Sequence, residues 1–312
     1  MQTVLITGGT GLVGTALARH LTRSGFHVII FTRNPEKQNT RSGLEFAHWD
    51  PSKGVLDATA FSRADVIVNL AGAGVVDRKW TDAYKKTIRE SRVRACSLLV
   101  DALQKKEHHI KAVVSASAIG WYGPDKAGAS RPFQEDDPHS DDFLGETCRD
   151  WEAAIDPVAG LGIRLVKMRF GIVLSKEGGA LEAFMRPLRF GLAAVIGRGE
   201  QRLSWIGMKD LCRMICFSLF ESELSGVYNA VAPSPVTNRQ LNKALGRVMC
   251  GKYFLCFNVP AFLIRLMLGS RSVEVLKSTT VSAAKIQSAG FSFAYPQLEE
   301  ALSVELSAAS DG

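Results

Sequence analysis

Three glycines near the start of the chain have the spacing of a phosphate-binding turn. Gly8, Gly11 and Gly14 follow an apolar run at residues 4–6, and a helical pattern begins directly after them. Glycine lets the backbone turn tightly and approach a ligand closely, and the free N–H groups at the start of a helix attract a phosphate. The spacing therefore predicts a site for a pyrophosphate, with further contacts from the intervening residues Thr10, Leu12 and Val13.

The elements on either side of this turn place it at the edge of a sheet. Residues 4–6 are β-formers suited to a strand buried on both faces, and residues 15–24 repeat apolar side chains at helical spacing. Further apolar runs, at 27–33, 65–72, 110–117 and 164–174, alternate with helical patterns. This alternation predicts an α/β fold with a Rossmann-like, doubly wound parallel sheet.

The end of the second expected strand carries the residues that would choose between two dinucleotides. Residues 27–33 end in Thr32 and Arg33. An acidic side chain at this point binds the ribose 2′-hydroxyl of NAD(H), whereas an arginine pairs with the 2′-phosphate of NADP(H). Arg33 therefore favours NADP(H). If Arg33 instead only faces solvent, Asp50 is the next candidate to contact the ribose.

Small side chains end the strand expected at residues 65–72. Leu70, Ala71 and Gly72 follow Asn69 at that end. Small residues allow a cofactor to lie across a strand end, so we expect these three to form the wall beside the adenosine and the diphosphate. The alternative for this strand is simple packing in the core.

These segments resemble those of the extended short-chain dehydrogenases/reductases, in one order along most of the chain. The matching segments are residues 7–14, 69–72, 115–123, 151–152, 171–174, 205–210 and 229–233. The chain is similar to an atypical subfamily of NAD-dependent epimerase/dehydratase-like proteins with a C-terminal domain of unknown function. The resemblance implies a dinucleotide-binding domain at 1–175, to which 205–232 returns, and a smaller substrate-binding and cap region at 176–312.

The resemblance also assigns side chains around the cofactor. It places Ser115 and Val173 at strand ends beside the cofactor. Arg92, on a helix expected at 81–104, falls where relatives have an asparagine near the cofactor. We expect it to reach a phosphate or ribose of the cofactor, and a surface salt bridge is its alternative role. Ser117 matches the catalytic serine, whose hydroxyl would hydrogen-bond the reacting group of the substrate, and an ordinary serine at a strand end is the alternative.

The sequence departs from the family on the catalytic helix. Relatives carry Tyr-x-x-x-Lys there, in which the lysine lowers the pKa of the tyrosine and holds the nicotinamide ribose while the tyrosine moves the proton. Leu144 and Cys148 stand at these two positions. The chain must therefore use another proton donor or carry out no redox chemistry.

Two functions remain open on these grounds. The first is an NADP(H)-dependent oxidoreductase or epimerase for a polar carbonyl or sugar-nucleotide-like substrate. Its candidate proton donor is Tyr122, beside Ser117, with Arg169 as an electrostatic helper, and packing as an aromatic wall is the alternative for Tyr122. The second is a sensor or regulatory protein that binds NADPH without turnover.

The composition argues against several other classes of protein. A chain of 312 residues with 46% hydrophobic and 22% charged residues is ordinary for a globular enzyme. The net charge of +7 favours anionic small ligands, but the basic residues are scattered, which argues against nucleic acid. The six cysteines form no C-x-x-C pair and no group of the six histidines has metal-ligand spacing, so we expect no metal site and buried or half-buried thiols.

Neither end of the chain suggests export or membrane insertion. The N-terminus enters the first strand at once, which leaves no room for a signal peptide and predicts a cytoplasmic protein. The apolar stretch at 259–268 is too short to cross a bilayer and contains Arg265, so we expect an amphipathic helix and no membrane partner. The resemblance allows a homodimer that acts on a small molecule.

Overall fold

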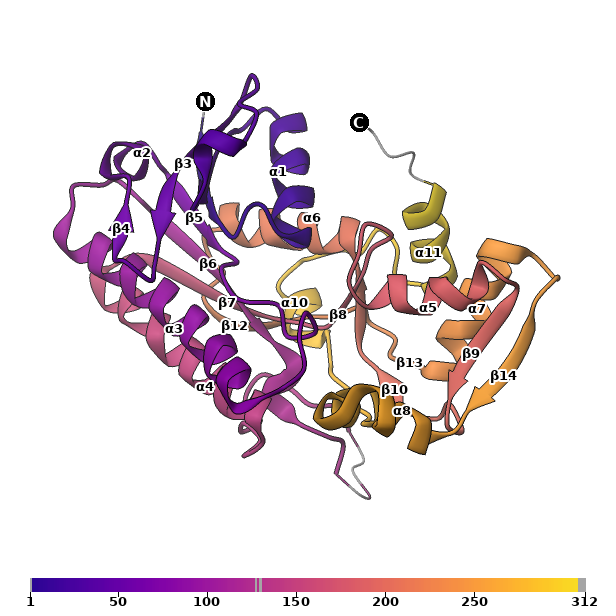
Figure 1. The fold of residues 1–312 in the computed structure, drawn as a ribbon. Helices are drawn as coiled ribbons and strands as arrows, with labels where there is room; N and C mark the ends of the chain where they lie inside the picture. The colour runs from indigo at the N-terminus through magenta and orange to yellow at the C-terminus, as the bar shows by residue number, and fades with distance from the viewer. Residues whose placement is uncertain (1, 127, 129–130, 308–312) are drawn as a thin grey trace.

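A computed structural model of the chain describes residues 2–126, 128 and 131–307. Its centre is an eight-stranded sheet that is parallel except for its last edge strand (Figure 1). In spatial order the strands are β12 (Gly226–Ala230), β7 (Arg164–Phe170), β6 (Ala112–Ala118), β5 (Val66–Asn69), β1 (Thr3–Thr7), β2 (His27–Thr32), β3 (Leu44–Asp50) and β4 (Val55–Leu56). The winding direction reverses between β1 and β5, which confirms the predicted doubly wound sheet.

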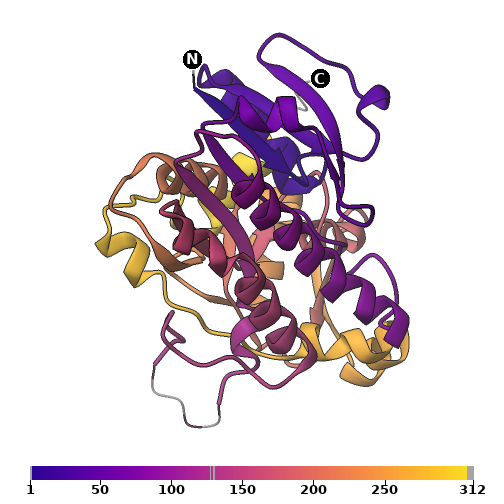
Figure 2. The same ribbon diagram turned by 90° about the vertical axis from the view of Figure 1, so that its left-hand side faces the viewer.

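Helices cover both faces of this sheet, because the central strands are apolar on both sides. One face is covered by α1 (Leu12–Arg23), α6 (Met208–Phe220) and α10 (Ala284–Ser288). The opposite face is covered by α2 (Ala58–Ser62), α3 (Asp82–Lys105) and α4 (Phe143–Ile155). In Figure 2, α3 and α4 lie side by side in front of the sheet. The core is therefore divided by the sheet into two apolar layers.

The strand predicted at 164–174 is in fact two strands that belong to different sheets. β7 ends at Phe170, and β8 (Ile172–Leu174) leaves the main sheet to pair with β11 (Trp205–Gly207). Gly171 separates them, and a Cβ there would lie 2.7 Å from the Ser204 carbonyl oxygen. The close approach of a second backbone at Gly171 explains why the strand breaks at this residue.

A second region follows β8 and has its own apolar core (Figure 1, right half). It contains α5 (Ala180–Leu188), β9 (Leu192–Ile196), β10 (Arg202–Leu203), β13 (Val236–Thr237), α7 (Asn238–Cys250), β14 (Leu255–Val259), α8 (Ala261–Leu268), α9 (Ser272–Leu276) and α11 (Leu298–Ser307). The short 3₁₀ helices of the chain are η1 (Pro35–Lys37), η2 (Ile119–Tyr122), η3 (Asp156–Leu161) and η4 (Gly269–Arg271). Thr237 and Gln240 form a capping box that fixes the start of α7.

Part of the C-terminal tail packs on the main sheet rather than within the second region. Val281, Ile286 and Phe291 belong to the apolar layer beneath α1 and α6. Asp210, at the start of α6, accepts hydrogen bonds from the backbone N–H groups of Ala294 and Tyr295, both at 2.9 Å. The tail therefore ties the two regions together, and the domain boundaries given above stay a prediction.

Candidate functional site

The glycine turn lies between β1 and α1, at the carboxyl edge of the sheet. Gly8 has a φ of +68°, which favours glycine, and a Cβ there would lie 2.7 Å from the Leu70 carbonyl oxygen. A Cβ on Gly14 would lie 2.4 Å from the Gly8 carbonyl oxygen, so α1 packs directly on the turn. At Gly11 the nearest atom to an added Cβ is 3.3 Å away. The first and third glycines are thus required by the fold, whereas the second leaves room for a ligand.

The first N–H groups of helix α1 have no side-chain acceptor. Gly11 is its N-cap residue, no side chain caps it, and its first turn contains no acidic residue. The positive end of the helix dipole therefore faces the turn without an internal anion. This is the arrangement that accepts a phosphate.

A buried hydrogen-bond network joins the ends of three neighbouring strands. The Thr7 hydroxyl donates to Asn69 Oδ1 at 2.7 Å, and Asn69 Nδ2 donates to Ser115 Oγ at 3.0 Å. The three residues are in register on β1, β5 and β6, and all are buried. Ser115 therefore lies beneath the edge of the sheet as a structural partner of Asn69, and its contact with a cofactor stays a prediction.

Arg33 follows β2 directly and lies at the surface. It makes no hydrogen bond or ion pair within the described part of the chain. Asp50, the alternative contact to the ribose, is buried and accepts hydrogen bonds from Ser52 Oγ at 2.6 Å and Ser52 N at 3.0 Å. The Ser52 hydroxyl bond is the main cause of a lowered pKa of Asp50, with Arg33 as a small contribution. Among the described residues, the Arg33 guanidinium therefore has no hydrogen-bond or ion-pair partner, whereas the Asp50 carboxylate already accepts hydrogen bonds from Ser52.

Arg92 holds the loop that carries the wall residues after β5. It is buried on α3, where its guanidinium stacks 4.8 Å from the Trp151 ring and Nη1 donates to the carbonyl oxygens of Ala73 (3.0 Å) and Ile88 (2.8 Å). Burial lowers its pKa. A Cβ on Gly72 would lie 3.1 Å from the Arg92 side chain. Arg92 therefore supports the loop from below rather than forming the surface salt bridge considered as its alternative.

Several of the predicted cofactor contacts converge around the start of α1. Leu12, Val13, Leu70 and Val173 are all half-buried and pack against the same apolar layer. An added Cβ at Gly179, in the loop after β8, would lie 3.2 Å from the Leu12 side chain. The second region thus comes close to the glycine turn at this point. Ala71 is buried beneath the sheet edge, whereas Thr10 and Thr32 lie near the surface.

The candidate catalytic residues Ser117 and Tyr122 belong to a buried ion-pair cluster. Ser117 Oγ donates to Glu152 Oε1 at 2.7 Å, and Arg169 binds both carboxylate oxygens of Glu152 through Nε (2.8 Å) and Nη2 (3.1 Å). Arg169 Nη1 donates to the Tyr122 hydroxyl at 2.9 Å, which in turn donates to Asn229 Oδ1 at 2.7 Å. Ser117, Arg169 and Asn229 are in register on β6, β7 and β12, so the sheet itself aligns the cluster.

Burial controls the protonation of this cluster. It raises the pKa of Tyr122 to about 12, against the opposing effect of Arg169. Burial works to lower the pKa of Arg169, but hydrogen bonds to Glu152 outweigh it and the pKa is raised. The guanidinium also stacks 3.7 Å from the centre of the Trp121 ring. Tyr122 is therefore a protonated, hydrogen-bonded phenol at neutral pH, and its role as a proton donor stays a prediction.

Leu144 and Cys148, which replace the tyrosine and lysine of the family motif, lie on α4 and pack against η2. A Cβ on Gly120 would lie 3.1 Å from Leu144 and 3.7 Å from Cys148, so η2 lies directly on this part of the helix. Burial raises the pKa of Cys148 to about 12, and its thiol lies 3.6 Å from the Ala118 carbonyl oxygen. A neutral, buried thiol cannot supply the positive charge of the family lysine.

We expect native Cys148 to resist alkylation, because a shift in pKa from 9.0 to about 12 lowers its thiolate fraction about 1,000-fold. Cys256, by contrast, is exposed on β14, so the expectation that all six thiols are buried or half-buried is wrong for this residue. Mass spectrometry after brief iodoacetamide treatment should find Cys256 modified well before Cys148. Equal labelling of the two thiols in folded protein would contradict this packing.

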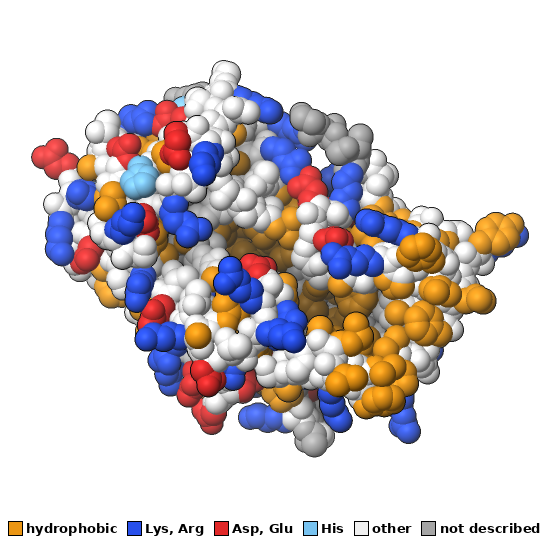
Figure 3. Space-filling view, viewed as in Figure 1, with side chains coloured by type: hydrophobic (Ala, Val, Ile, Leu, Met, Phe, Trp, Pro, Cys, Tyr) orange, Lys and Arg blue, Asp and Glu red, His pale blue; other side chains and the backbone are white. Residues whose placement is uncertain are grey.

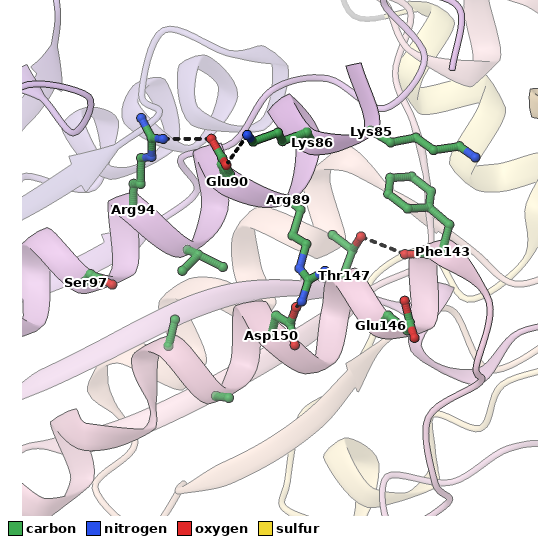
Figure 4. A pocket seen from close by; sticks show the side chains of 13 residues that line it. Lys85, Lys86, Arg89, Glu90, Arg94, Ser97, Phe143, Glu146, Thr147 and Asp150 are labelled. Carbon is green, nitrogen blue, oxygen red and sulfur yellow. Dashed lines mark hydrogen bonds and ion pairs between the residues drawn. The ribbon is translucent and has the colours of Figure 1, made fainter. Parts of the chain in front are cut away.

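A separate groove of about 860 Å³ lies between α3 and α4 on the outer surface (Figure 4). Five of its charged side chains form ion pairs with each other: Arg89 with Asp150, and Arg94 and Lys86 with Glu90. None of the predicted site residues lines this groove. The predicted cofactor contacts therefore lie outside this groove.

Sequence reasoning missed three polar residues of the site. Asn69 and Asn229 have no side-chain exposure, and Glu152 is nearly as buried. For the two asparagines the available signal was a polar residue inside an apolar strand, which must find a hydrogen-bond partner. Glu152 lies on helix α4, where this signal does not apply. Among the described residues, no group of His, Cys, Asp and Glu is placed to hold a metal ion.

A glycine turn at the reversal point of a doubly wound sheet defines a Rossmann-type protein of the short-chain dehydrogenase/reductase class. A model of the NAD dependent epimerase/dehydratase family matches residues 4–154, and a domain of unknown function, DUF1731, matches residues 259–304. Epimerase family protein ML0860 of Mycobacterium leprae is 35% identical over 302 residues, covering 96% of this chain and 94% of that protein. The chain belongs to the NAD dependent epimerase/dehydratase family, and the predicted resemblance is confirmed.

Solved structures agree with this assignment. The human epimerase family protein SDR39U1 (isoform 2), crystallised with NADPH, has a TM-score of 0.83 and 29% identity, covering 97% of this chain and 98% of the human chain. A nucleoside-diphosphate sugar epimerase from Corynebacterium glutamicum has a TM-score of 0.75 and 31% identity, covering 98% of this chain and 58% of its own. The chain is thus an NAD(P)-binding protein of the epimerase family.

Proposed function

We propose that this protein binds NADP(H) in preference to NAD(H). The observation that carries the proposal is the free guanidinium of Arg33 at the end of β2, next to an Asp50 carboxylate that is already hydrogen-bonded to Ser52. A 2′-phosphate would gain a charged partner there, whereas a 2′-hydroxyl would find no free carboxylate. The similar human protein that was crystallised with NADPH supports the same choice.

The residues of the turn fit a pyrophosphate. The space beside Gly11, the uncapped start of α1 and the absence of an acid from its first turn favour a bound anion. We assign the pyrophosphate to the turn, with Thr10 and the N–H groups of Leu12 and Val13 as donors. Thr32 lies beside Arg33 at the ribose phosphate, and Leu70, Ala71 and Gly72 form the wall, held by Arg92 from below. Val173 and Ser115 complete the set as contacts toward the nicotinamide half.

We further propose an oxidoreductase or epimerase activity on a polar carbonyl or sugar-nucleotide-like substrate. Bound NADP(H) would supply or accept a hydride at its nicotinamide. The similarity to a protein described as a nucleoside-diphosphate sugar epimerase supports this substrate class. Arg169 would hold Tyr122 in place, and Ser117 would support Arg169 through their shared partner Glu152. A proton could leave Tyr122 only if its bond to Asn229 is exchanged for one to the substrate.

A second candidate function is a sensor or regulatory protein that binds NADPH without turnover. The observation that favours it is the replacement of the Tyr-x-x-x-Lys pair by Leu144 and the neutral thiol of Cys148, together with the buried hydrogen bonds of Tyr122. Such a protein needs the cofactor cradle but no proton relay. A homodimer also stays a prediction.

Replacement of Arg33 by alanine tests the cofactor preference. We expect Arg33→Ala to raise the Kd for NADPH about 10- to 100-fold, because a charge-assisted hydrogen bond contributes about 1.5–3 kcal/mol. The Kd for NADH should change little. Energy transfer from tryptophan to bound NADPH or NADH measures both values. Arg41→Ala is the matched control, since Arg41 precedes β3 at the opposite edge of the sheet and is also exposed.

A turnover assay separates the two candidate functions. Carbonyl compounds and sugar nucleotides are screened for loss of NADPH absorbance, and Tyr122→Phe and Ser117→Ala are then compared with the native chain. Loss of turnover in Tyr122→Phe with an unchanged Kd for NADPH would support the enzyme. Tight NADPH binding without turnover of any compound supports the sensor, and preferred binding of NADH would overturn the proposed cofactor.

A further inference from the structure

Large apolar side chains gather on one face of the second region. Figure 3 shows them as an orange area over β9, β14 and α8. We call this area the apolar patch, and its six most exposed members are 65–83% accessible: Phe190, Tyr253, Leu255, Phe262, Leu266 and Met267. A large contiguous apolar surface of this kind marks an interaction site.

Helix α8 is an apolar and uncovered part of the patch. Residues 261–268 are apolar at every position except Arg265, and none of them is buried. Phe262 and Leu266 lie one turn apart on the same face, as do Leu263 and Met267. Within the described residues, this exposed apolar side of α8 is therefore left without a packing partner.

Strand β14, at the edge of the second region, extends the apolar patch. β14 pairs only with β9 in its two-stranded sheet, and four consecutive residues, 255–258, are exposed. Natural sheets usually protect such an edge with charged side chains or a covering element. Here the edge carries Leu255 and Phe257 instead, next to the exposed aromatic rings of Phe190 and Tyr253.

The chain segments that form the patch carry basic residues and no acidic ones. No acidic residue occurs between Glu223 and Glu274, or between Glu182 and Glu200. The first of these segments contains six basic residues and the second three: Arg239, Lys243, Arg247, Lys252, Arg265 and Arg271, then Arg186, Arg189 and Arg198. Arg189, Lys252 and Arg265 are exposed and directly neighbour or belong to the patch, and Lys252 Nζ lies 5.7 Å from the centre of the Tyr253 ring. The partner that this surface fits is therefore anionic as well as apolar.

We propose that the apolar patch docks on an anionic lipid bilayer. Exposed Phe, Leu and Met side chains would enter the boundary between headgroups and acyl chains, and Tyr253 suits the headgroup level. Lys252, Arg265 and Arg189 would keep their charges among the lipid phosphates while their aliphatic stems follow the apolar surface. A second copy of this chain is the poorer fit, because it would bring two basic surfaces together.

This attachment is peripheral. Residues 2–126, 128 and 131–307 contain no helix with the length and apolar character needed to cross a bilayer. The docking surface revises the expectation of no membrane partner, which rested on the interrupted stretch at 259–268. It also leaves the cofactor turn free, since α1 and the turn lie in the other half of the molecule (Figure 1).

Vesicle sedimentation with the full chain tests the proposal. The probes are vesicles of phosphatidylcholine alone and of phosphatidylcholine mixed with phosphatidylserine. We expect binding to the mixed vesicles at least about tenfold tighter than to the neutral ones. The double variant Leu266→Ser and Met267→Ser should lose binding to both, and Lys252→Glu with Arg265→Glu should lose the preference for phosphatidylserine. Val55→Ser, an exposed apolar residue on β4, is the control and should bind like the native chain.

Other outcomes would overturn the proposal. Equal binding to the two kinds of vesicle would show that the patch does not select anionic lipids. No binding to either kind would show that the patch does not dock on a membrane. Light scattering identifies the alternative partner: a dimer that dissociates in the Leu266→Ser and Met267→Ser variant, without vesicle binding, would assign the patch to a second copy. The substituted side chains are exposed, and an unchanged melting temperature would show that the variants fold.

Discussion

Glu152→Ala is expected to lower the free energy of unfolding by about 3–5 kcal/mol, because it leaves the guanidinium of Arg169 buried without its carboxylate. Both side chains are almost fully buried, with exposures of 4% for Glu152 and 2% for Arg169. The substitution also removes the acceptor of the Ser117 hydroxyl. Urea denaturation followed by tryptophan fluorescence measures the change.

Asp156→Ala provides the matched control for this prediction. Asp156 is paired with Lys167 at 2.6 Å, but it is 53% exposed, so its loss should cost about 0–1 kcal/mol. A double variant, Glu152→Leu with Arg169→Met, should recover much of the loss, since replacing a buried pair by apolar residues is often close to neutral. If Glu152→Ala were no more harmful than Asp156→Ala, the cluster would not be the buried unit that we describe.

The glycine turn was predictable from sequence because every part of it is local. Gly8, Gly11 and Gly14 lie within seven residues, between a strand and a helix whose patterns are both clear. The position of Arg33 after β2 was predictable for the same reason, since a fixed spacing from the turn brings this strand end to the same edge. Its contact with a cofactor stays a prediction. The family and the fold follow from these motifs, and both predictions are confirmed.

Part of the ion-pair cluster was predicted, since the sequence grouped Tyr122 with Ser117 and Arg169. Glu152 and Asn229 could not be added, because they join the cluster only through tertiary packing. Glu152 lies on α4 and Arg169 on β7, and the order of the sheet adds Ser117 and Asn229 from two further strands. A sequence pattern gives each of these elements but not the rotation of α4 against the sheet. The same limit explains Arg92, whose burial depends on the packing of α3 against α4 and the loop after β5.

The cluster and the cofactor turn divide the carboxyl edge of the sheet between them. The turn, with its free N–H groups and Arg33, is positive and open to an anion. The cluster beneath β6, β7 and β12 is closed, and its charges are satisfied internally. Binding of a dinucleotide therefore needs no rearrangement of the cluster, whereas proton transfer from Tyr122 does.

Gly11→Ala is expected to weaken NADPH binding about 10- to 100-fold, because a methyl group forced against the pyrophosphate costs about 1–3 kcal/mol. The fold itself should tolerate the change: Gly11 has a φ of −82°, and its added Cβ would meet only one atom, at 3.3 Å. Loss of glycine at the N-cap should lower the free energy of unfolding by about 1 kcal/mol or less.

Gly14→Ala should differ, since its Cβ would lie 2.4 Å from the Gly8 carbonyl oxygen and 2.5 Å from the Gly9 Cα, and neither backbone atom can move without opening the turn. We expect this variant to lose about 1–3 kcal/mol of stability as well as NADPH binding. Gly160→Ala, with no atom within 4 Å of its Cβ, is the control for both. Calorimetric titration with NADPH and thermal melts of the three variants separate the effects. An unchanged Kd in Gly11→Ala would mean that the pyrophosphate does not approach the turn at this glycine.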